Sequence, residues 1–322
     1  MAETAHNVLV TGVAGFIGSH LAARLLDLGH SVVGVDCFTD YYDVRIKKDN
    51  LSSLLPHERF RFVGESVNTV DLRELLAGVD CVFHQAAQAG VRASWGEQFE
   101  TYIDANIRAT QRLCEAARET KLRRFVYASS SSVYGETTEL PMKESHPTRP
   151  VSPYGVTKLD GENLCLLYAK SYELPVVCLR YFTVYGPRQR PDMAFHRFLR
   201  AAATGSPVEV YGNGAQTRDF TYIGDAVAAN VAAMSYDGPE RVFNIGGGSR
   251  VALNSALDVI GRHARGEFEV RYRDAQRGDV THTYADISLA ARELGYEPRT
   301  GLEDGIAREA EWIASVYTRI GG

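Results

Sequence analysis

A tyrosine and a lysine four residues apart, Tyr154 and Lys158, have the side chains and the spacing needed for proton transfer. On a helix, side chains at positions i and i+4 lie on the same face. A lysine ammonium near a phenol favours the phenolate, so Tyr154 could accept a proton from a substrate hydroxyl near neutral pH. The pair alone is weak evidence, because the same spacing is common on exposed helix faces.

Four consecutive serines, Ser129 to Ser132, follow an apolar run that ends at Ala128. A serine-rich stretch is typical of a solvated turn, which is the simplest interpretation of this one. The surrounding sequence decides whether these hydroxyls have another role.

Three glycines, Gly12, Gly15 and Gly18, lie between an apolar run and a segment with helical periodicity. Glycine at such a place lets the backbone approach a pyrophosphate, whose charge then faces the amides of the helix N-terminus. Glycines also serve simple close packing, so the triplet needs support. Asp36 ends the next apolar run, where a carboxylate can accept hydrogen bonds from the adenosine ribose hydroxyls and repel a 2′-phosphate, which favours NAD over NADP.

Short β-branched runs alternate with helical segments in the first half of the chain. The predicted strands are Asn7–Thr11, Ser31–Val35, Phe60–Val63, Cys81–His84, Phe125–Ala128 and Val176–Leu179. The predicted helices are Phe16–Leu28, Val70–Leu76, Phe99–Glu119 and Tyr154–Tyr172. This alternation predicts an α/β fold with a Rossmann-type, doubly wound parallel sheet.

After Arg180 the alternation loosens, and prolines and glycines interrupt it more often. We therefore predict two domains: an NAD-binding Rossmann domain over residues 1–180 and a smaller α/β substrate-binding domain over residues 181–322. Some elements of the second are expected to return to the first.

Composition narrows the classes of function. The 322 residues carry a net charge of −5 without a basic stripe, so neither nucleic acid nor an anionic membrane is an expected partner. The five cysteines are odd in number and far apart, which suits free thiols in a reducing compartment. The histidines and cysteines show no metal-ligand spacing, so no metal is assigned. With no signal-peptide pattern and no long apolar run, the expected location is cytoplasmic.

These motifs together resemble the extended short-chain dehydrogenase/reductase family, in particular its nucleotide-sugar 4-epimerases, over nearly the whole chain. The resemblance implies catalysis by Tyr154 and Lys158 together with Ser130, which then lies in an active site rather than in a simple turn. It also implies NAD as the cofactor. The residues that the resemblance implies for NAD binding, besides Tyr154 and Lys158, are Gly12, Gly15, Phe16, Ile17, Gly18, Asp36, Ala86, Ala87 and Asn106. One departure is Gly64-Glu65-Ser66, where the family usually has an aspartate that contacts adenine.

The serine run also separates reactions within the family. Related dehydratases carry Asp-Glu, and uronate decarboxylases a Glu, directly before the residue equivalent to Val133, where this chain has Ser131 and Ser132. A reaction that needs only reversible hydride transfer is therefore favoured.

The stretches 35–45 and 183–193 resemble those of UDP-glucuronate 4-epimerases, with Thr183 where glucose/galactose enzymes have asparagine. Thr183 and Arg190 could bind a C6 carboxylate, although Arg190 could equally be an ordinary surface-loop residue. By resemblance, Arg218 and Arg277 bind the diphosphate and Asp279 the uridine ribose, with ordinary salt bridges as the alternative for the arginines. Arg92 completes the expected substrate residues.

The function implied by the resemblance is interconversion of UDP-glucuronate and UDP-galacturonate at C4, through a 4-keto intermediate and transient NADH. The first alternative is a UDP-glucose/galactose or N-acetylhexosamine 4-epimerase. A UDP-glucuronate decarboxylase and a non-catalytic cofactor-binding protein are less favoured alternatives. Apolar residues on the helices around 99–117 and 164–169 exceed what one core-facing stripe needs, so a homodimer is expected.

Overall fold

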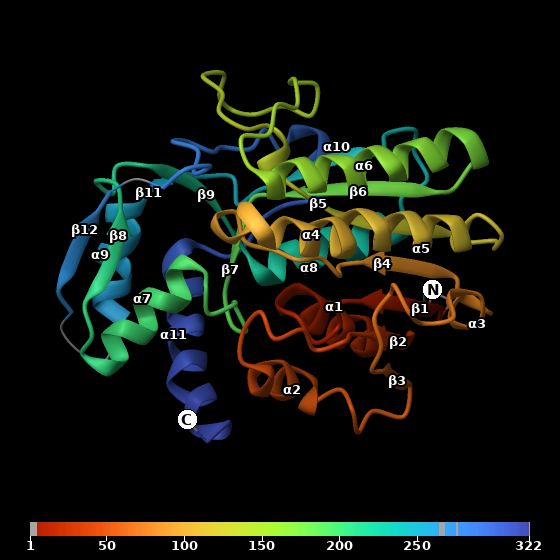
Figure 1. Ribbon diagram of the computed structural model, residues 1–322, viewed down its shortest axis with the longest axis horizontal. Coiled ribbons are helices and arrows are strands. Elements are labelled where there is room, and N and C mark those ends of the chain that lie inside the picture. Colours follow the sequence, from red (N-terminus) through yellow and green to blue (C-terminus); the bar gives the residue numbers. More distant parts are fainter. Residues whose placement is uncertain (1–4, 264–267, 275, 322) are drawn as a thin grey trace.

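A seven-stranded, all-parallel sheet forms the centre of the molecule in the computed structural model, which describes residues 5–263, 268–274 and 276–321 (Figure 1). The strand order is β10-β6-β5-β4-β1-β2-β3. Its strands are β1 (Asn7–Thr11), β2 (Ser31–Val35), β3 (Phe60–Val63), β4 (Cys81–His84), β5 (Arg124–Ser130), β6 (Val176–Tyr181) and β10 (Val242–Ile245). The predicted fold class is confirmed.

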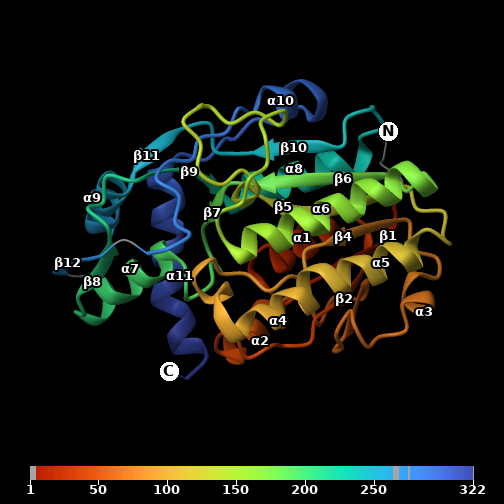
Figure 2. The same cartoon turned by 45° about the horizontal axis from the view of Figure 1, so that its top comes forward.

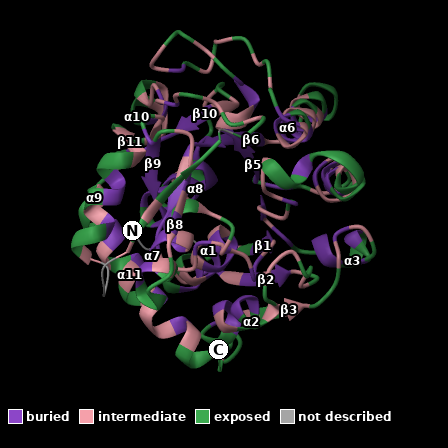
Figure 3. Ribbon diagram, turned by 60° about the vertical axis from the view of Figure 1, so that its left-hand side comes forward, coloured by how far each residue is buried: buried purple, intermediate pink, exposed green. Residues whose placement is uncertain are grey.

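Helices cover both faces of this sheet because the side chains of each strand point alternately to opposite faces. In β1, Leu9 packs into a core shared with one set of helices, whereas Val8 and Val10 face the other set. The first set is α3 (Leu72–Leu76), α5 (Ala109–Ala117) and α6 (Pro153–Tyr172), and the second includes α1 (Phe16–Asp27), α2 (Val44–Ser52) and α8 (Ile223–Ser235). Figure 2 shows α5 and α6 side by side, and Figure 3 shows the buried sheet between helices whose outer faces are exposed.

The chain winds outward in opposite directions from β1, which pairs with β2 on one side and β4 on the other. In an open parallel sheet, the carboxyl ends of the strands at this point form a crevice for a ligand. The glycine triplet follows β1, Asp36 follows β2, and Ala86 and Ala87 follow β4. The topology thus brings three of the predicted cofactor segments to one edge.

A smaller part of the molecule, at the left in Figure 1, contains two further sheets. One consists of β7 (Thr183–Tyr185), β9 (Thr217–Tyr222) and β11 (Arg250–Ala252), the other of β8 (Val208–Tyr211) and β12 (Val270–Arg273). Helices α7 (Ala194–Thr204), α9 (Leu253–His263) and α11 (Leu302–Arg319) pack around them, and α10 (Ser288–Leu294) lies beside β10. The chain crosses between the two parts more than once, since β10 and α8 pack into the large sheet layer.

Two helical segments differ from expectation. The polar helix α2 was not anticipated; Asp43 caps it by accepting a hydrogen bond from the Arg45 amide. The single helix expected over Phe99–Glu119 is α4 (Phe99–Tyr102), a π-helical turn at Ile103–Arg108 and then α5. Over the described residues, none of the helices has the length and apolar character needed to cross a membrane.

Candidate active site

Helix α6 positions Tyr154 and Lys158. Ser152 caps the helix by accepting a hydrogen bond from the Gly155 amide at 3.1 Å, and Pro153 occupies the first turn, where its missing N–H costs nothing. Tyr154 therefore lies in the first turn and Lys158 one turn later, on the same face. The Lys158 ammonium lies over the Tyr127 ring, 4.5 Å from its centroid.

The serine run begins in a buried strand and continues into a short 3-10 turn at Ser131–Val133. Ser130 is the last residue of β5, and its Oγ accepts a hydrogen bond from the Ser132 amide at 3.1 Å. The Ser130 hydroxyl proton thus remains available to a second oxygen. Ser129 donates to the Glu162 carboxylate at 2.6 Å, and Arg180 holds that carboxylate with two hydrogen bonds. Ser129 and Ser130 are therefore buried and hydrogen-bonded within the protein, not part of a solvated turn.

The backbone of the glycine turn, Gly12 to Gly18, has a conformation that leaves no room for side chains at two of its glycines. Gly12 has a φ of +69°, and a Cβ there would lie 2.8 Å from the Ala86 amide nitrogen. A Cβ at Gly18 would overlap the carbonyl oxygen of Gly12. Among the described residues, no side chain caps the first turn of α1 and no acidic residue lies in it. Its amides and dipole are therefore available to an anion.

Asp36 connects the glycine turn to the loop that follows β2. Its Oδ2 accepts from the Ala14 amide at 3.1 Å and its Oδ1 from the Phe38 amide at 2.9 Å. Each carboxylate oxygen has a second lone pair, so Asp36 can still accept from ribose hydroxyls.

A chain of hydrogen bonds fixes Ala86. The Thr110 hydroxyl donates to the Asn106 carbonyl, so its oxygen accepts from His84 Nε2; Thr11 then donates to His84 Nδ1 and accepts from the Ala86 amide. Both ring nitrogens are satisfied by a neutral imidazole. Burial, and the charge of Lys158, lower the pKa of His84 to about 3.

A first cavity of about 570 Å³ lies at this edge of the sheet. The predicted cofactor residues that line it are Gly12, Gly15, Phe16, Ile17, Gly18, Asp36, Ala86, Ala87, Tyr154 and Lys158. Asn106 lies behind the wall: its amide group bonds both the N–H and C=O of Gln88 and also Thr157 on α6. Asn106 thus supports the lining rather than forming it.

A second cavity of about 550 Å³ adjoins the first. The predicted catalytic and substrate-binding residues in its wall are Arg92, Ser130, Ser131, Ser132, Tyr154, Thr183, Arg190 and Asp279. Tyr154 and Arg190 line both cavities. The phenol is thus at the boundary across which a reacting group and a cofactor would meet.

The acidic side chains of the second cavity are all ion-paired. Asp192 pairs with Arg190, Glu209 with Arg273, and Asp279 with Arg92. Arg218 instead donates to the carbonyls of Thr217 and Thr281, and Arg277 is exposed; neither is among the residues that line the cavity.

Burial raises the pKa of Tyr154, and the positive charge of Arg190 and a hydrogen bond with Ser130 oppose that rise. Burial also lowers the pKa of Lys158 to about 8. The spacing of Tyr154 and Lys158 is visible in the sequence, whereas the electrostatic effect of Arg190 on the phenol is not. Tyr41 and Lys47 were not among the predicted site residues, but they line the first cavity from the loop and helix after β2. Their position shortly after Asp36 in the sequence is the signal that could have indicated them.

Comparisons with known proteins agree with this geometry. Residues 8–246 match the family described as the NAD dependent epimerase/dehydratase family. The chain belongs to this family. The first cavity fits the cofactor of the NAD dependent epimerases: glycines line its wall, the uncapped amides of α1 are available to an anion, and the Asp36 carboxylate in the wall could accept from ribose hydroxyls. The cofactor is therefore NAD.

Individual members of the NAD dependent epimerase/dehydratase family resemble the chain over nearly its full length. An uncharacterized UDP-glucose epimerase of Bacillus subtilis (strain 168) is 46% identical over 96% of this chain and 98% of its own. A UDP-glucuronate 4-epimerase of Thermodesulfobacterium geofontis (strain OPF15) is 36% identical over 94% and 95%. The crystal structure of UDP-glucuronic acid 4-epimerase from Bacillus cereus with UDP-glucuronic acid and NAD superposes with a TM-score of 0.93, at 42% identity, covering 97% of this chain and 100% of that chain.

Proposed function

We propose that the protein interconverts UDP-glucuronate and UDP-galacturonate by inverting C4. The observation that carries the proposal is the position of Tyr154, which lines both the NAD cavity and a second cavity that is bordered by hydroxyls and arginines. The similar Bacillus cereus protein, whose structure contains UDP-glucuronic acid, supports the choice of substrate.

Tyr154 acts as the base that accepts the proton of the C4 hydroxyl. The Ser130 oxygen already accepts from the Ser132 amide, so its hydroxyl proton, which bonds the Tyr154 phenol, can be donated to the same sugar oxygen when substrate binds. NAD, when bound, would supply the hydride chemistry that inversion at C4 requires. The Lys158 ammonium lies over the aromatic face of Tyr127, so its protons would be available to the bound nucleotide.

Two features of the second cavity support epimerisation over elimination of water or loss of carbon dioxide. Ser131 and Ser132 bring hydroxyls where acid-dependent relatives have carboxylates. The acidic side chains that line the cavity are ion-paired, as described above, so none is a free general acid.

The 4-keto form of a uronate is a β-keto acid, which loses carbon dioxide when its carboxylate aligns with the carbonyl π system. Thr183, Ser132 and Arg190 line the cavity and could hold a C6 carboxylate in a non-reactive orientation. Arg92 and Asp279, paired at 2.6 Å, lie in the same wall as candidates for the nucleotide end of the substrate. Arg218, on β9, and Arg277, on the segment after β12, lie outside the lining of this cavity.

A UDP-glucose 4-epimerase is the second candidate, because the Bacillus subtilis relative carries that name. An NMR time course of the purified protein with UDP-glucuronate and no added NAD separates the two. Appearance of UDP-galacturonate supports the proposal together with a retained cofactor. Turnover of UDP-glucose alone selects the second candidate, and formation of UDP-xylose overturns the argument from the serines.

We further propose a cytoplasmic homodimer that contacts through α5 and α6. Leu167 and Tyr172 on α6 are 55% and 51% exposed, unusual for large apolar side chains on a helix that also packs into the core. A light-scattering mass of two chains, reduced to one by Leu167→Glu, is the expected result. A wild-type mass of one chain contradicts the dimer.

A further inference from the structure

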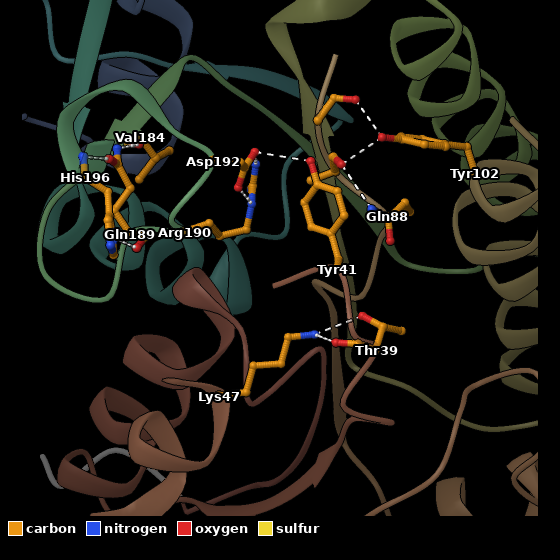
Figure 4. A network of polar contacts seen from close by, with 12 residues as sticks. Thr39, Tyr41, Lys47, Gln88, Tyr102, Val184, Gln189, Arg190, Asp192 and His196 are labelled. Carbon is orange, nitrogen blue, oxygen red and sulfur yellow. Dashed lines mark hydrogen bonds and ion pairs between the residues drawn. The ribbon is translucent and has the colours of Figure 1, made fainter. Parts of the chain in front are cut away.

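Two loops from different parts of the fold meet at Tyr41 and Asp192. Tyr41 belongs to the loop after β2 that also contains Asp36, and Asp192 belongs to the loop after β7. The Tyr41 hydroxyl donates to Asp192 Oδ2 at 3.3 Å (Figure 4). Tyr41 lines both cavities, and this hydrogen bond joins it to the loop of Asp192 in the wall of the second cavity, the proposed sugar cavity.

Asp192 holds Arg190 by one edge of its guanidinium. Arg190 Nε and Nη2 donate to the two oxygens of Asp192, each at 3.0 Å. A guanidinium has five N–H donors in a planar fork, so three remain for another acceptor. This geometry fixes the plane of the Arg190 side chain without using all of its hydrogen-bonding capacity.

The backbone next to Arg190 is also fixed. Gln189 donates from Nε2 to the Val184 carbonyl, and His196 bonds Gln189 twice, from its amide and from Nδ1. Figure 4 shows these contacts on one side of Arg190 and Asp192 with Tyr41 on the other. The remaining freedom of Arg190 is in its side chain, which Asp192 restrains.

The Tyr41 hydroxyl also lies close to the segment after β4. Gly90 has a φ of +105°, and a Cβ there would overlap the Tyr41 hydroxyl. The Gly90 carbonyl accepts from the Tyr102 hydroxyl at 2.7 Å, and the Tyr102 ring contacts the Tyr154 ring edge-on at 6.3 Å between centroids. The series of contacts therefore closes around the reacting phenol.

We propose that Asp192 and Tyr41 are positioning residues that hold Arg190 at the wall shared by the two cavities, where its charge stabilises the Tyr154 phenolate. The role of the Tyr154 phenolate as the base in the reaction rests on the proposed function. Arg190 lines both cavities with Tyr154, and its charge opposes the rise in the pKa of that phenol. The other ionisable groups around Tyr154 are Asp192, Tyr102, Tyr127 on β5 and Lys158 on α6.

Asp192→Asn tests the role of Asp192, because the two possible effects have opposite signs. If Asp192 positions Arg190, its loss lets the guanidinium move away, the Tyr154 pKa rises, and the acidic limb of the kcat–pH profile moves up by about one unit. Below that limb kcat falls about tenfold. If Asp192 is only a nearby negative charge, its removal lowers the phenol pKa and moves the limb down, which overturns the proposal.

Asp49→Asn is the matched control, because Asp49 binds Arg319 through the same two-bond geometry outside both cavities. We expect its pH profile to stay as in the wild type. Tyr41→Phe removes no charge and should shift the limb in the same upward direction, with about threefold lower kcat. Tyr272→Phe, which loses an exposed hydroxyl on β12, is its control.

A direct titration separates this proposal from the proposed function. In the NAD-containing protein labelled with 13Cζ-tyrosine, the Tyr154 resonance is identified by its loss in Tyr154→Phe and followed against pH. The phenol of Asp192→Asn should titrate at higher pH than that of the wild type even if UDP-glucuronate is not the substrate. An unchanged or lower titration point overturns the positioning role, whereas absent turnover with an upward shift overturns only the substrate.

Discussion

The two cavities are built in different ways. In the NAD cavity, the ends of neighbouring strands bring together Asp36 and the glycine turn, where the backbone itself lies in the wall and a Cβ at Gly12 or Gly18 would overlap other backbone atoms. The second cavity, the proposed sugar cavity, is lined by side chains from segments between Phe16 and Asp279, and its acidic residues are in ion pairs. A backbone-lined site is difficult to alter without disturbing the fold, whereas side chains can be exchanged singly. The difference explains how one cofactor site can serve many sugar reactions.

Tyr154 lies in both cavities, so its substitution should give the largest effect on activity. Tyr154→Phe removes the base and leaves the ring, and we expect kcat to fall by about 10²- to 10⁴-fold. The content of bound NAD should stay as in the wild type, because the glycine turn and Asp36 are untouched. Turnover and the NAD released on denaturation measure the two quantities, with Tyr272→Phe as the control. A decrease of less than about tenfold would assign the base to another residue.

Lys158 should lower stability in the neutral range. Burial lowers its pKa from 10.5 to about 8, so below pH 8 the folded protein carries a buried charge that the unfolded chain solvates. The unfolded chain binds more protons between these values, so this penalty fades as pH rises from 8 to 10.5. Lys158→Met should therefore raise the free energy of unfolding at pH 7 by up to about 3 kcal/mol, with little gain above pH 10.5.

Urea unfolding of the NAD-free protein at pH 7 and above pH 10.5 measures the effect of Lys158→Met on the free energy of unfolding. Lys170→Met is the control, since Lys170 is exposed on the same helix. A gain that is equal at the two pH values would show that packing, rather than charge, is responsible.

The glycine turn should tolerate no side chain at Gly18. A Cβ there overlaps the Gly12 carbonyl oxygen, so Gly18→Ala should displace α1, lower stability by about 1–3 kcal/mol and release NAD. Gly261→Ala on α9 meets no atom within 4 Å and should be neutral or stabilising by up to about 1 kcal/mol. Thermal unfolding with and without added NAD compares the two. Retention of NAD by Gly18→Ala would contradict the close-approach argument.

The sequence predicted the NAD side well because its signals are local. The first four strands have the predicted bounds, and the glycine triplet, Asp36 and the Tyr154–Lys158 pair each lie in one short motif at a strand or helix end. Helix α2 was missed because its residues are mostly polar, with no clear apolar stripe.

The sugar side was less predictable because its contacts are long-range. Ser129 reaches Glu162, and Tyr41 reaches Asp192, 151 residues away, and no local pattern marks either partner. The ion pair of Arg190 with Asp192 and the exposed position of Arg277 likewise depend on how loops from distant elements fold together.

The smallest expected effect is on the purity of the reaction product, and it tests the side chains of the sugar cavity. The hydroxyls of Thr183 and Ser132 line the cavity, and the proposed function uses them to hold the C6 carboxylate of the 4-keto form. Thr183→Val combined with Ser132→Ala keeps the shape of the cavity but removes both donors, each of which contributes about 1.5–3 kcal/mol when it bonds a charged group. Since Arg190 remains, we expect epimerisation to continue while a decarboxylated UDP-pentose rises to a detectable fraction, measured by NMR of the products. Because the NAD cavity is unchanged, cofactor content should stay constant, and product purity equal to that of the wild type would show that Arg190 or another group restrains the carboxylate alone.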